Sequence, residues 1–295
     1  MNSVKEKAYA KINLFIDVLG KRDDGFHDIA TVMHTVSLAD DITVSVADGF
    51  RGGRSVKISL DGNRRLPVDS KNLAVSAANL FLERAGINAD VFIKLNKRIP
   101  ISSGLAGGSA DAAATLRAMN KLFRRPLTDK MLLSLASELG SDVPFCLLGG
   151  TAFCEGRGEM ITRLPSALSL HTVVAVAGEH VSTPRAYAAL DEIYSDFKSP
   201  RGSDSSTKLE AVINSAKTGA IDTSSLYNIF EEAVLPMCER ATLIKTNMLS
   251  LGAKASLMSG SGPSVYGIFE DEKTAVSAEQ ALRNDGILAF YARSI

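Results

Sequence analysis

The first predicted element is a strand over residues 8–19, where apolar and polar side chains alternate. One face of this strand carries four aliphatic side chains: Ile12, Leu14, Ile16 and Val18. Successive side chains of a strand point to opposite faces, so Lys11 and Asn13 share the other face with Phe15 and Asp17. The pattern therefore predicts a strand that presents a lysine and an asparagine on the same face.

Further alternation in the first half of the chain predicts strands over residues 29–38, 42–46, 56–60 and 91–95. A helix is predicted over residues 72–85, with Asp69 or Ser70 as its N-cap. A second helix begins after Thr128, which is expected to be its N-cap, and ends near residue 140. Strands thus cluster near the start of the chain.

In the second half, strands are predicted over residues 151–154, 172–177, 254–258, 265–269 and 288–291. Helices are predicted over residues 184–193, 208–216, 236–251 and 272–284. Residues 198–206 are predicted to be a mobile loop, because Ser, Gly, Pro and charged residues dominate them. Strands that cluster rather than alternate regularly with helices indicate an α+β fold, here in two lobes at residues 1–164 and 165–295.

A glycine-rich stretch over residues 99–116 links the strand at residues 91–95 to an alanine-rich helix. The glycines at positions 104, 107 and 108 lack Cβ atoms, which leaves the N–H groups of the turn bare. These donors converge at the positive end of the helix dipole, where a phosphate group binds readily. The stretch therefore indicates a nucleotide-dependent phosphotransferase.

Known phosphate-binding fingerprints do not fit this stretch, because no Gly-Lys-Ser/Thr follows the glycines and no acidic ribose ligand follows on a second parallel strand. A structural tight turn before a helix is therefore an open alternative. The hydroxyl of Ser109 could contact a phosphate oxygen or Mg²⁺, and Ser109 could equally be the N-cap of the helix; the two roles do not exclude each other. Asp111 is expected to complement the helix dipole.

Composition narrows the class of protein. Of 295 residues, 45% are hydrophobic, which is ample for packed cores and excludes global disorder. Lys plus Arg and Asp plus Glu both number 33, and this balance argues against a nucleic-acid binder. Apolar runs are shorter than the roughly 18 residues of a membrane span, and the N-terminus lacks a signal-peptide pattern. Three cysteines without Cys-x-x-Cys spacing indicate reduced thiols in a cytoplasmic protein.

Three stretches resemble the GHMP kinases in their order and spacing, at residues 8–14, 100–113 and 258–264. Four shorter motifs resemble the branch of that family whose substrate is a cytidine diphosphate ester of methylerythritol. These motifs are Lys11-Ile12-Asn13-Leu14, Asp24-Gly25-Phe26-His27, Gly140-Ser141-Asp142-Val143-Pro144-Phe145 and Gly156-Arg157-Gly158-Glu159. The resemblance extends almost end to end and is weakest at residues 195–225.

The resemblance implies a ribosomal-protein-S5-like N-terminal ATP-binding domain and a ferredoxin-like C-terminal domain, with the active site between them. It implies that ATP, with Mg²⁺, phosphorylates the 2-hydroxyl of the methylerythritol unit in the non-mevalonate route to isoprenoid precursors. The expected partner is this small-molecule substrate, with no nucleic acid and no membrane. The protein is expected to be cytoplasmic and a monomer or weak homodimer.

Two residues match the catalytic pair of the family. Asp142 is implied to accept the proton of the substrate hydroxyl, and its alternative role is a helix N-cap ahead of Val143 and Pro144. Lys11 is implied to keep Asp142 ionised and to stabilise the transferring phosphoryl group. Without the resemblance, Lys11 is expected to be a solvated strand residue.

The resemblance also implies two binding sites. The substrate-binding residues would be Asn13, Phe26, His27, Thr183 and Tyr187. Among them, the rings of Phe26 and Tyr187 would enclose the cytosine, and His27 would bond its edge. The ATP-binding residues would be Asn72, Lys97, Pro100, Ser103, Gly104, Leu105, Ala106, Gly107, Gly108, Ser109, Gly260, Ser261 and Gly262. Any Mg²⁺ contact in the loop is assigned to Ser109.

Three positions depart from the usual family pattern. Ala106 replaces a glycine, and this is free of strain only where its φ angle is negative. Ala110 replaces a serine, and Phe26 stands where many relatives carry tyrosine. Homoserine or mevalonate kinase activity, a non-catalytic nucleotide sensor and an RNA-binding protein are the alternatives to the kinase hypothesis.

Overall fold

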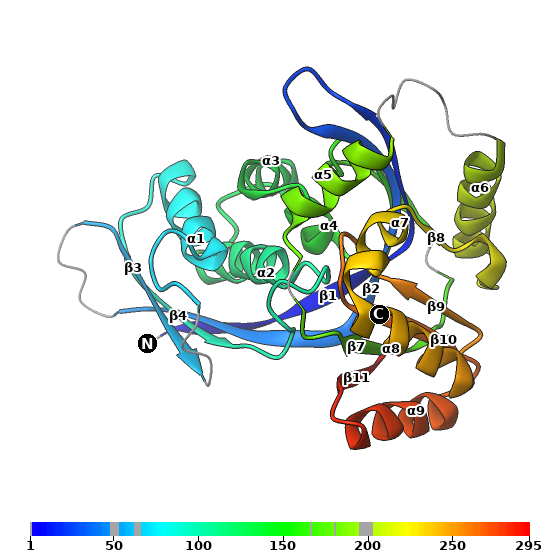
Figure 1. The fold of residues 1–295 in the computed structure, drawn as a ribbon. Coiled ribbons are helices and arrows are strands. Elements are labelled where there is room, and N and C mark those ends of the chain that lie inside the picture. The colour runs from blue at the N-terminus through cyan, green and yellow to red at the C-terminus, as the bar shows by residue number, and fades with distance from the viewer. Residues whose placement is uncertain (1, 48–52, 62–65, 166, 180, 195–202) are drawn as a thin grey trace. The chain divides into compact units, whose positions relative to one another are not determined.

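The computed structural model describes residues 2–47, 53–61, 66–165, 167–179, 181–194 and 203–295 (Figure 1). Contacts between residues divide the chain into two compact units, whose segments alternate along the sequence. Unit 1 comprises Met1–Ala10, Ala39–Ile101 and Ala106–Leu148, and unit 2 comprises Lys11–Leu38, Ser102–Leu105 and Gly149–Ile295. The predicted division of the chain at residue 164 stays a prediction.

Two long strands, β1 (Ser3–Lys21) and β2 (His27–Val46), form the N-terminal part of the chain. The sequence predicted two strands in place of β2, and that expectation is wrong. The residues between them, Ala39 to Asp41, include no glycine or proline that would interrupt a strand. The strand therefore continues through Asp40, whose buried carboxylate accepts hydrogen bonds from two backbone N–H groups.

In the residues that the structure describes, unit 1 joins strand pairs to four helices. Strand β3 (Ser55–Asp61) pairs in parallel with β4 (Asp90–Asn96), and β4 pairs antiparallel with the end of β2. The helices are α1 (Leu73–Arg84), α2 (Gly107–Leu122), α3 (Asp129–Leu139) and α4 (Val143–Leu148). They pack on one another through side chains that are fully buried, such as Phe81 and Leu116.

Helix caps in unit 1 test two of the predictions. Thr128 caps α3 by accepting a hydrogen bond from the N–H of Met131, as predicted. The predicted caps of α1 are wrong, because Asn72 caps this helix through a bond from the N–H of Ala74. Asp69 instead accepts a bond from the N–H of Lys71 in the preceding turn. An Asx turn and an N-cap have similar local sequence signals, which explains the error.

Unit 2 contains a four-stranded antiparallel sheet with the order β11-β7-β10-β9. Its strands are β7 (His171–Val176), β9 (Ala255–Met258), β10 (Val265–Phe269) and β11 (Leu288–Arg293). Helices α8 (Glu239–Ser250) and α9 (Glu272–Asn284) pack against it. This βαββαβ arrangement is ferredoxin-like, and the α+β prediction is confirmed.

Besides this sheet, the second half of β1 and the first half of β2, unit 2 contains further elements. They are β5 (Thr151–Glu155), β6 (Met160–Leu164), α5 (Thr183–Ile193), α6 (Ser203–Thr218), η1 (Thr223–Ser225), β8 (Tyr227–Asn228), α7 (Phe230–Val234) and η2 (Leu235–Met237). The mobile loop predicted at residues 198–206 lies outside the described residues up to residue 202. From Ser203 onward the chain is helical, so that part of the prediction is wrong.

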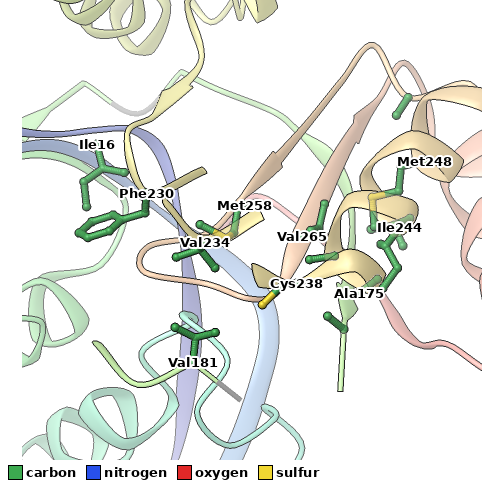
Figure 2. Close-up of a cluster of buried hydrophobic side chains, with 14 of the residues drawn as sticks. Ile16, Ala175, Val181, Phe230, Val234, Cys238, Ile244, Met248, Met258 and Val265 are labelled. Atoms are coloured by element: carbon green, nitrogen blue, oxygen red, sulfur yellow. The ribbon is translucent and has the colours of Figure 1, made fainter. Parts of the chain in front are cut away.

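The hydrophobic core of unit 2 joins the four-stranded sheet, its helices and β1 (Figure 2). Ile16 of β1, Phe230 of α7, Met248 of α8 and Val265 of β10 are all buried members of this core. Full burial of one large apolar side chain stabilises a fold by about 1.5–3 kcal/mol. The core thus anchors the second half of β1 through Ile16. Within the described ranges, no helix is both long and apolar enough to cross a membrane.

Candidate active site

A chain of hydrogen bonds orients the lysine and asparagine of β1. Lys11 Nζ donates to Asn13 Oδ1 at 2.6 Å, Asn13 Nδ2 donates to Thr31 Oγ1 at 2.8 Å, and Thr31 donates to the carbonyl of Phe15. Lys11 is only 4% exposed, so the solvated alternative for this residue is wrong. Within the described part of unit 2, this buried ammonium has no carboxylate partner and contacts a neutral amide oxygen. Such a cation favours an anionic ligand.

The glycine loop between β9 and β10 lies directly beside this lysine. A Cβ atom on Gly260 would lie 3.2 Å from Lys11 Nζ and 3.3 Å from Asn13 Oδ1. Gly104 approaches the same loop, because its own Cβ would lie 2.1 Å from the carbonyl oxygen of Ser259. Ser259 Oγ also donates to the carbonyl of Gly104 at 3.2 Å. Only glycine permits these contacts, so residues 104 and 259–262 form one surface with Lys11.

His27 is buried and is held by a carboxylate that sequence reasoning missed. Its Nε2 lies 2.7 Å from Asp191 Oδ1, and Lys21 Nζ donates to Asp191 Oδ2 at 2.5 Å. Burial works against ionisation of Asp191, yet the bonds from Lys21 and His27 outweigh it and hold the pKa of this carboxyl below its ordinary value. Tyr187 stacks on the His27 ring with 4.6 Å between the ring centroids. His27, Tyr187 and Asp191 thus form one cluster.

The two remaining predicted substrate-binding residues are Phe26 and Thr183. The Phe26 ring is 53% exposed, which is unusual for a large apolar side chain, and the Arg157 guanidinium lies 4.9 Å from its centroid. Thr183, the first residue of α5, is within hydrogen-bond distance of Ser261, at 3.0 Å between their hydroxyl oxygens. Helix α5 therefore touches both the His27 cluster and the Gly260 loop.

In unit 1, the glycine-rich stretch leads into α2 without a side-chain cap. The N-cap residue is Ala106, which forms no capping bond, so the first N–H groups of α2 have no intrahelical partner. Ser109 is the third residue of this helix, and its alternative role as N-cap is wrong. Ala106 has φ 56° and ψ 31°, the left-handed region, so the strain expected for a positive φ is present.

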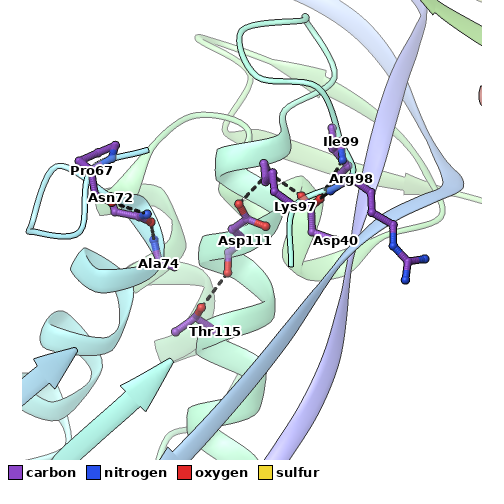
Figure 3. A network of polar contacts seen from close by, with 9 residues as sticks. All are labelled: Asp40, Pro67, Asn72, Ala74, Lys97, Arg98, Ile99, Asp111 and Thr115. Atoms are coloured by element: carbon purple, nitrogen blue, oxygen red, sulfur yellow. Dashed lines mark hydrogen bonds and ion pairs between the residues drawn. The ribbon is translucent and has the colours of Figure 1, made fainter. Parts of the chain in front are cut away.

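Behind the start of α2, Lys97 forms a buried ion-pair cluster with Asp40 and Asp111 (Figure 3). Lys97 Nζ lies 2.5 Å from Asp40 Oδ2 and 2.7 Å from Asp111 Oδ2. Burial raises the pKa of the Asp111 carboxyl to about 8, and the attraction of Lys97 only partly opposes this. Asp111 lies beyond the first turn of α2 and pairs with Lys97, so its predicted dipole role is wrong.

The cluster also fixes the approach of the strand to the loop. Asp40 Oδ1 accepts bonds from the N–H groups of Arg98 at 2.5 Å and Ile99 at 2.8 Å. A Cβ on Gly107 would lie 2.9 Å from Lys97 Nζ, so the helix start needs a glycine here. Pro100 follows this segment, whereas Ser103 and Leu105 belong to unit 2, where the carbonyl of Leu105 accepts from the N–H of Lys11.

Two further predicted residues of unit 1 occupy helix starts. Asn72 uses its amide to cap α1 and to donate to the carbonyl of Pro67 at 2.9 Å. Asp142 directly precedes α4, and its carbonyl accepts from the N–H of Cys146. The capping role of Asp142 therefore stays open beside its catalytic one.

Sequence reasoning missed several polar residues that hold these groups: Lys21, Thr31, Asp40, Asp191, Asn228, Glu231 and Tyr266. One signal was available for Asp191, because it lies four residues after Tyr187 and hence on the same helix face. Asn228 had no such signal. It lies in a strand of two residues that no periodic pattern reveals.

Two family models match this chain. The model described as "GHMP kinases N terminal domain" matches residues 72–150, and the model described as "GHMP kinases C terminal" matches residues 210–288.

Curated relatives and solved structures agree with these matches. The chain is similar to the 4-diphosphocytidyl-2-C-methyl-D-erythritol kinase of Caldicellulosiruptor saccharolyticus, with 42% identity over 94% of this chain and 92% of the relative. It is similar to that of Acetivibrio thermocellus, with 38% identity over 100% of both chains. A crystal structure of 4-(cytidine 5'-diphospho)-2C-methyl-D-erythritol kinase matches with a TM-score of 0.81 and 32% identity over 98% of each chain. A homoserine kinase from Cytophaga hutchinsonii matches with a TM-score of 0.75 and 22% identity, over 100% of this chain and 95% of that one, and shares the fold.

Proposed function

The chain belongs to the 4-diphosphocytidyl-2-C-methyl-D-erythritol kinase family within the GHMP kinases, and we propose that its site residues serve that family's reaction. The reaction transfers the γ-phosphate of ATP to the 2-hydroxyl of 4-(cytidine 5'-diphospho)-2-C-methyl-D-erythritol. It is a step of the methylerythritol phosphate route to isoprenoid precursors. A cytoplasmic location and a monomeric or weakly dimeric state stay predictions.

The observation that carries this proposal is the buried ammonium of Lys11 beside the Gly260 loop. Phosphoryl transfer requires a cation that offsets the negative charge on the transferring group, placed where water does not screen it. Lys11 meets this requirement, because it is buried and its partner in the described part of unit 2 is the neutral Asn13. Asn13 both orients Lys11 and lies beside the same loop, where it would bond substrate hydroxyls.

In unit 1, the N–H groups at the start of α2 are proposed to contact the phosphates of ATP. The absence of a capping side chain at Ala106 supports this, because it leaves the positive end of the helix dipole open to an anion. In unit 2, the loop of residues 260–262 is proposed as a second phosphate contact. Pro100 and residues 103–109 are the other proposed ATP contacts of the glycine-rich stretch. Asn72 and Lys97 are proposed near the adenine, although their polar groups are engaged in the α1 cap and in the Asp40–Asp111 cluster.

Mg²⁺ would accompany ATP at this site. In the part of the chain that the structure describes, no group of three acidic, His or Cys side chains is placed to hold a metal ion. Mg²⁺ in kinases is commonly held by one or two protein oxygens together with phosphates and waters. Ser109, in the first turn of α2, is the hydroxyl that would contribute such an oxygen. When bound, the ion neutralises charge on the phosphates.

The cytidine end of the substrate would bind at His27, Phe26 and Tyr187. Because Nε2 of His27 faces the Asp191 carboxylate, that nitrogen carries a proton. The Asp191 contact thus sets which nitrogen of a neutral ring is basic, and a cytosine edge differs from a uracil edge in this donor and acceptor pattern. The exposed ring of Phe26 offers a stacking surface, and Thr183 would contact the substrate near Ser261.

Asp142 is proposed to accept the proton of the substrate hydroxyl as the phosphoryl group transfers. Asp142→Asn should keep ATP binding and lower kcat by about 10²–10⁴-fold, which is the usual contribution of a general base. Asp129→Asn is the matched control, because Asp129 also lies at a helix start and is exposed. Equal, small effects of the two substitutions would leave Asp142 as a helix cap.

The substrate assignment is tested by supplying the purified full chain with ATP and Mg²⁺ and one of three acceptors. The expected result is turnover of the cytidine diphosphate ester and not of homoserine or mevalonate. Turnover of homoserine or mevalonate, with none of the cytidine ester, would overturn the assignment while leaving the kinase chemistry in place.

A further inference from the structure

Asn228 is a buried amide at the junction of three segments of unit 2. It lies in β8, opposite Ile16 of β1, and is 3% exposed. Its Nδ2 donates to the carbonyl oxygens of Met258 at 2.7 Å and Gly260 at 2.9 Å. Its Oδ1 accepts from the N–H of Phe230 at the start of α7. Both donors and the carbonyl oxygen of this side chain are therefore used within the fold.

Glu231 completes the hold on the same backbone. Its Oε1 accepts from the N–H of Met258 at 2.7 Å, and its other oxygen is paired with Lys245. Asn228 and Glu231 together bind the N–H and the carbonyl of Met258 and the carbonyl of Gly260. A backbone held at several polar groups by one buried and one partly buried side chain has little freedom to shift.

The position of Gly260 matters because it borders the proposed catalytic lysine. A Cβ on this residue would lie 3.2 Å from Lys11 Nζ and 3.2 Å from the carbonyl oxygen of Gly104. Tyr266, on the strand that follows the loop, donates to the carbonyl of Asn13 at 2.8 Å. A shift of the Gly260 backbone would therefore change the surroundings of both Lys11 and Asn13.

We propose that Asn228 is a positioning residue for phosphoryl transfer, which fixes the carbonyl of Gly260 and thereby the loop of residues 259–262 against Lys11. This inference rests on the proposed function of that loop. Asn228 acts through the loop and touches no substrate. A displacement of about 1 Å in a positioning element lowers the rate of catalysis by roughly 10²-fold.

The sharpest perturbation is Asn228→Asp, which preserves the size of the side chain. The new carboxylate still accepts from the N–H of Phe230, but it places an oxygen against two carbonyl oxygens in place of two donors. Repulsion then moves the loop away. A protonated carboxyl group donates one hydrogen bond, so acid conditions restore part of the contact.

The charged groups around this position define the expected pH dependence. Glu231 and Glu232 of α7 and Lys245 of α8 line the same cavity of about 340 Å³ as Asn228, and Lys11 lies beyond Gly260. Burial and the two glutamates favour the protonated form of the new carboxyl group, whereas the lysines oppose it. The Asn228→Asp variant should therefore recover activity, relative to the unchanged protein, as the pH falls from 8.5 to 6.

Asn120→Asp is the matched control. Asn120 is also buried, at 7% exposure, and its amide bonds both the N–H and the carbonyl of Leu127, in a part of unit 1 without proposed site residues. Both substitutions should lower the Tm. Only Asn228→Asp should lower kcat, by about 10²-fold, with the KM of the cytidine ester changed less than threefold, because that ligand is bound at the His27 cluster.

The experiment measures kcat, both KM values, the Tm and the Kd for ATP by calorimetry for the three proteins at pH 6 and 8.5. If the carboxylate prevents folding, Asn228→Ala removes the two bonds to the loop, together with the bond from the N–H of Phe230, without adding a charge. Its kcat is expected to fall likewise. A kcat equal to that of the Asn120→Asp control, or a parallel loss in every kinetic constant without pH recovery, would overturn the proposal. Failure of the unchanged protein to use the cytidine ester would instead count against the proposed function, and ATP hydrolysis would then report on the loop.

Discussion

Replacement of Ala106 by glycine is expected to stabilise the protein, although glycine usually destabilises a helical region. Ala106 is the N-cap of α2 and has φ 56° and ψ 31°. In this left-handed region the Cβ of an L-residue crowds the following carbonyl oxygen, at a cost of about 1–2 kcal/mol. Glycine removes this cost, but it adds about 0.4–1 kcal/mol of conformational entropy to the unfolded chain. The difference is a gain of roughly 0.5–1 kcal/mol, given that glycine is also the better N-cap.

The matched control is Ala188→Gly, because Ala188 is exposed on α5 and has an ordinary helical backbone. The same chemical change should there cost about 1 kcal/mol. Urea unfolding of both variants and the unchanged protein, followed by circular dichroism, gives the two differences in free energy with opposite expected signs. A loss of stability in Ala106→Gly similar to that of Ala188→Gly would refute the assignment of strain to Ala106.

Three further substitutions test other parts of the candidate site. Gly104→Ala should lower kcat/KM by more than about 10²-fold and the unfolding free energy by about 1–3 kcal/mol, because the new Cβ would lie 2.1 Å from the Ser259 carbonyl oxygen. Unaltered kinetics would show that the two loops separate freely. Asp191→Asn should raise the KM of the cytidine ester about tenfold and leave the KM of ATP unchanged, because it weakens the hydrogen bond that holds His27. Because the pKa of Asp191 is lowered, protonation of this carboxyl in the unchanged protein should raise the KM of the ester only at pH values below the ordinary carboxyl range. Asp111→Asn should flatten the pH dependence of stability between pH 4 and 8. In this pH range the Asp111 carboxyl of the folded protein, with its pKa raised to about 8, binds a proton that the unfolded chain has lost. The stability of the unchanged protein therefore falls as the pH rises, by at most about 1.4 kcal/mol per pH unit. Urea midpoints that change equally with pH in both proteins would contradict this.

The sequence predicted elements well where one local pattern decides the outcome. The alternation from Ala8 onward is a strand, and Thr128 is a cap, because side-chain direction and a single hydrogen bond settle these features. Errors arose where two local signals compete. The cap of α1 is Asn72 and not a residue of the turn before it, and the break expected inside β2 is absent.

Much of the candidate site depends on contacts between distant segments, which no local pattern reveals. Asp111 contacts Lys97 because a buried polar group needs a hydrogen-bond partner, and the cost of leaving it unpaired exceeds a helix-dipole effect. Asp191 reaches His27 across 164 positions of the chain. The periodic pattern predicted that Asp111 and Asp191 lie on helices, but their partners follow only from the tertiary fold.

Helix α5 fixes the spacing between two groups of polar residues within unit 2. Thr183 touches Ser261 at one end, and Tyr187 and Asp191 hold His27 farther along, each four residues from the last and on one helix face. With a rise of about 1.5 Å per residue, the span from Thr183 to Asp191 is about 12 Å. In the proposed site, this helix would set the distance between the residues proposed to bind the cytidine end of the substrate and the loop proposed to bind the phosphates of ATP. We expect a ligand whose base and acceptor hydroxyl are spaced differently to contact one end of the helix only.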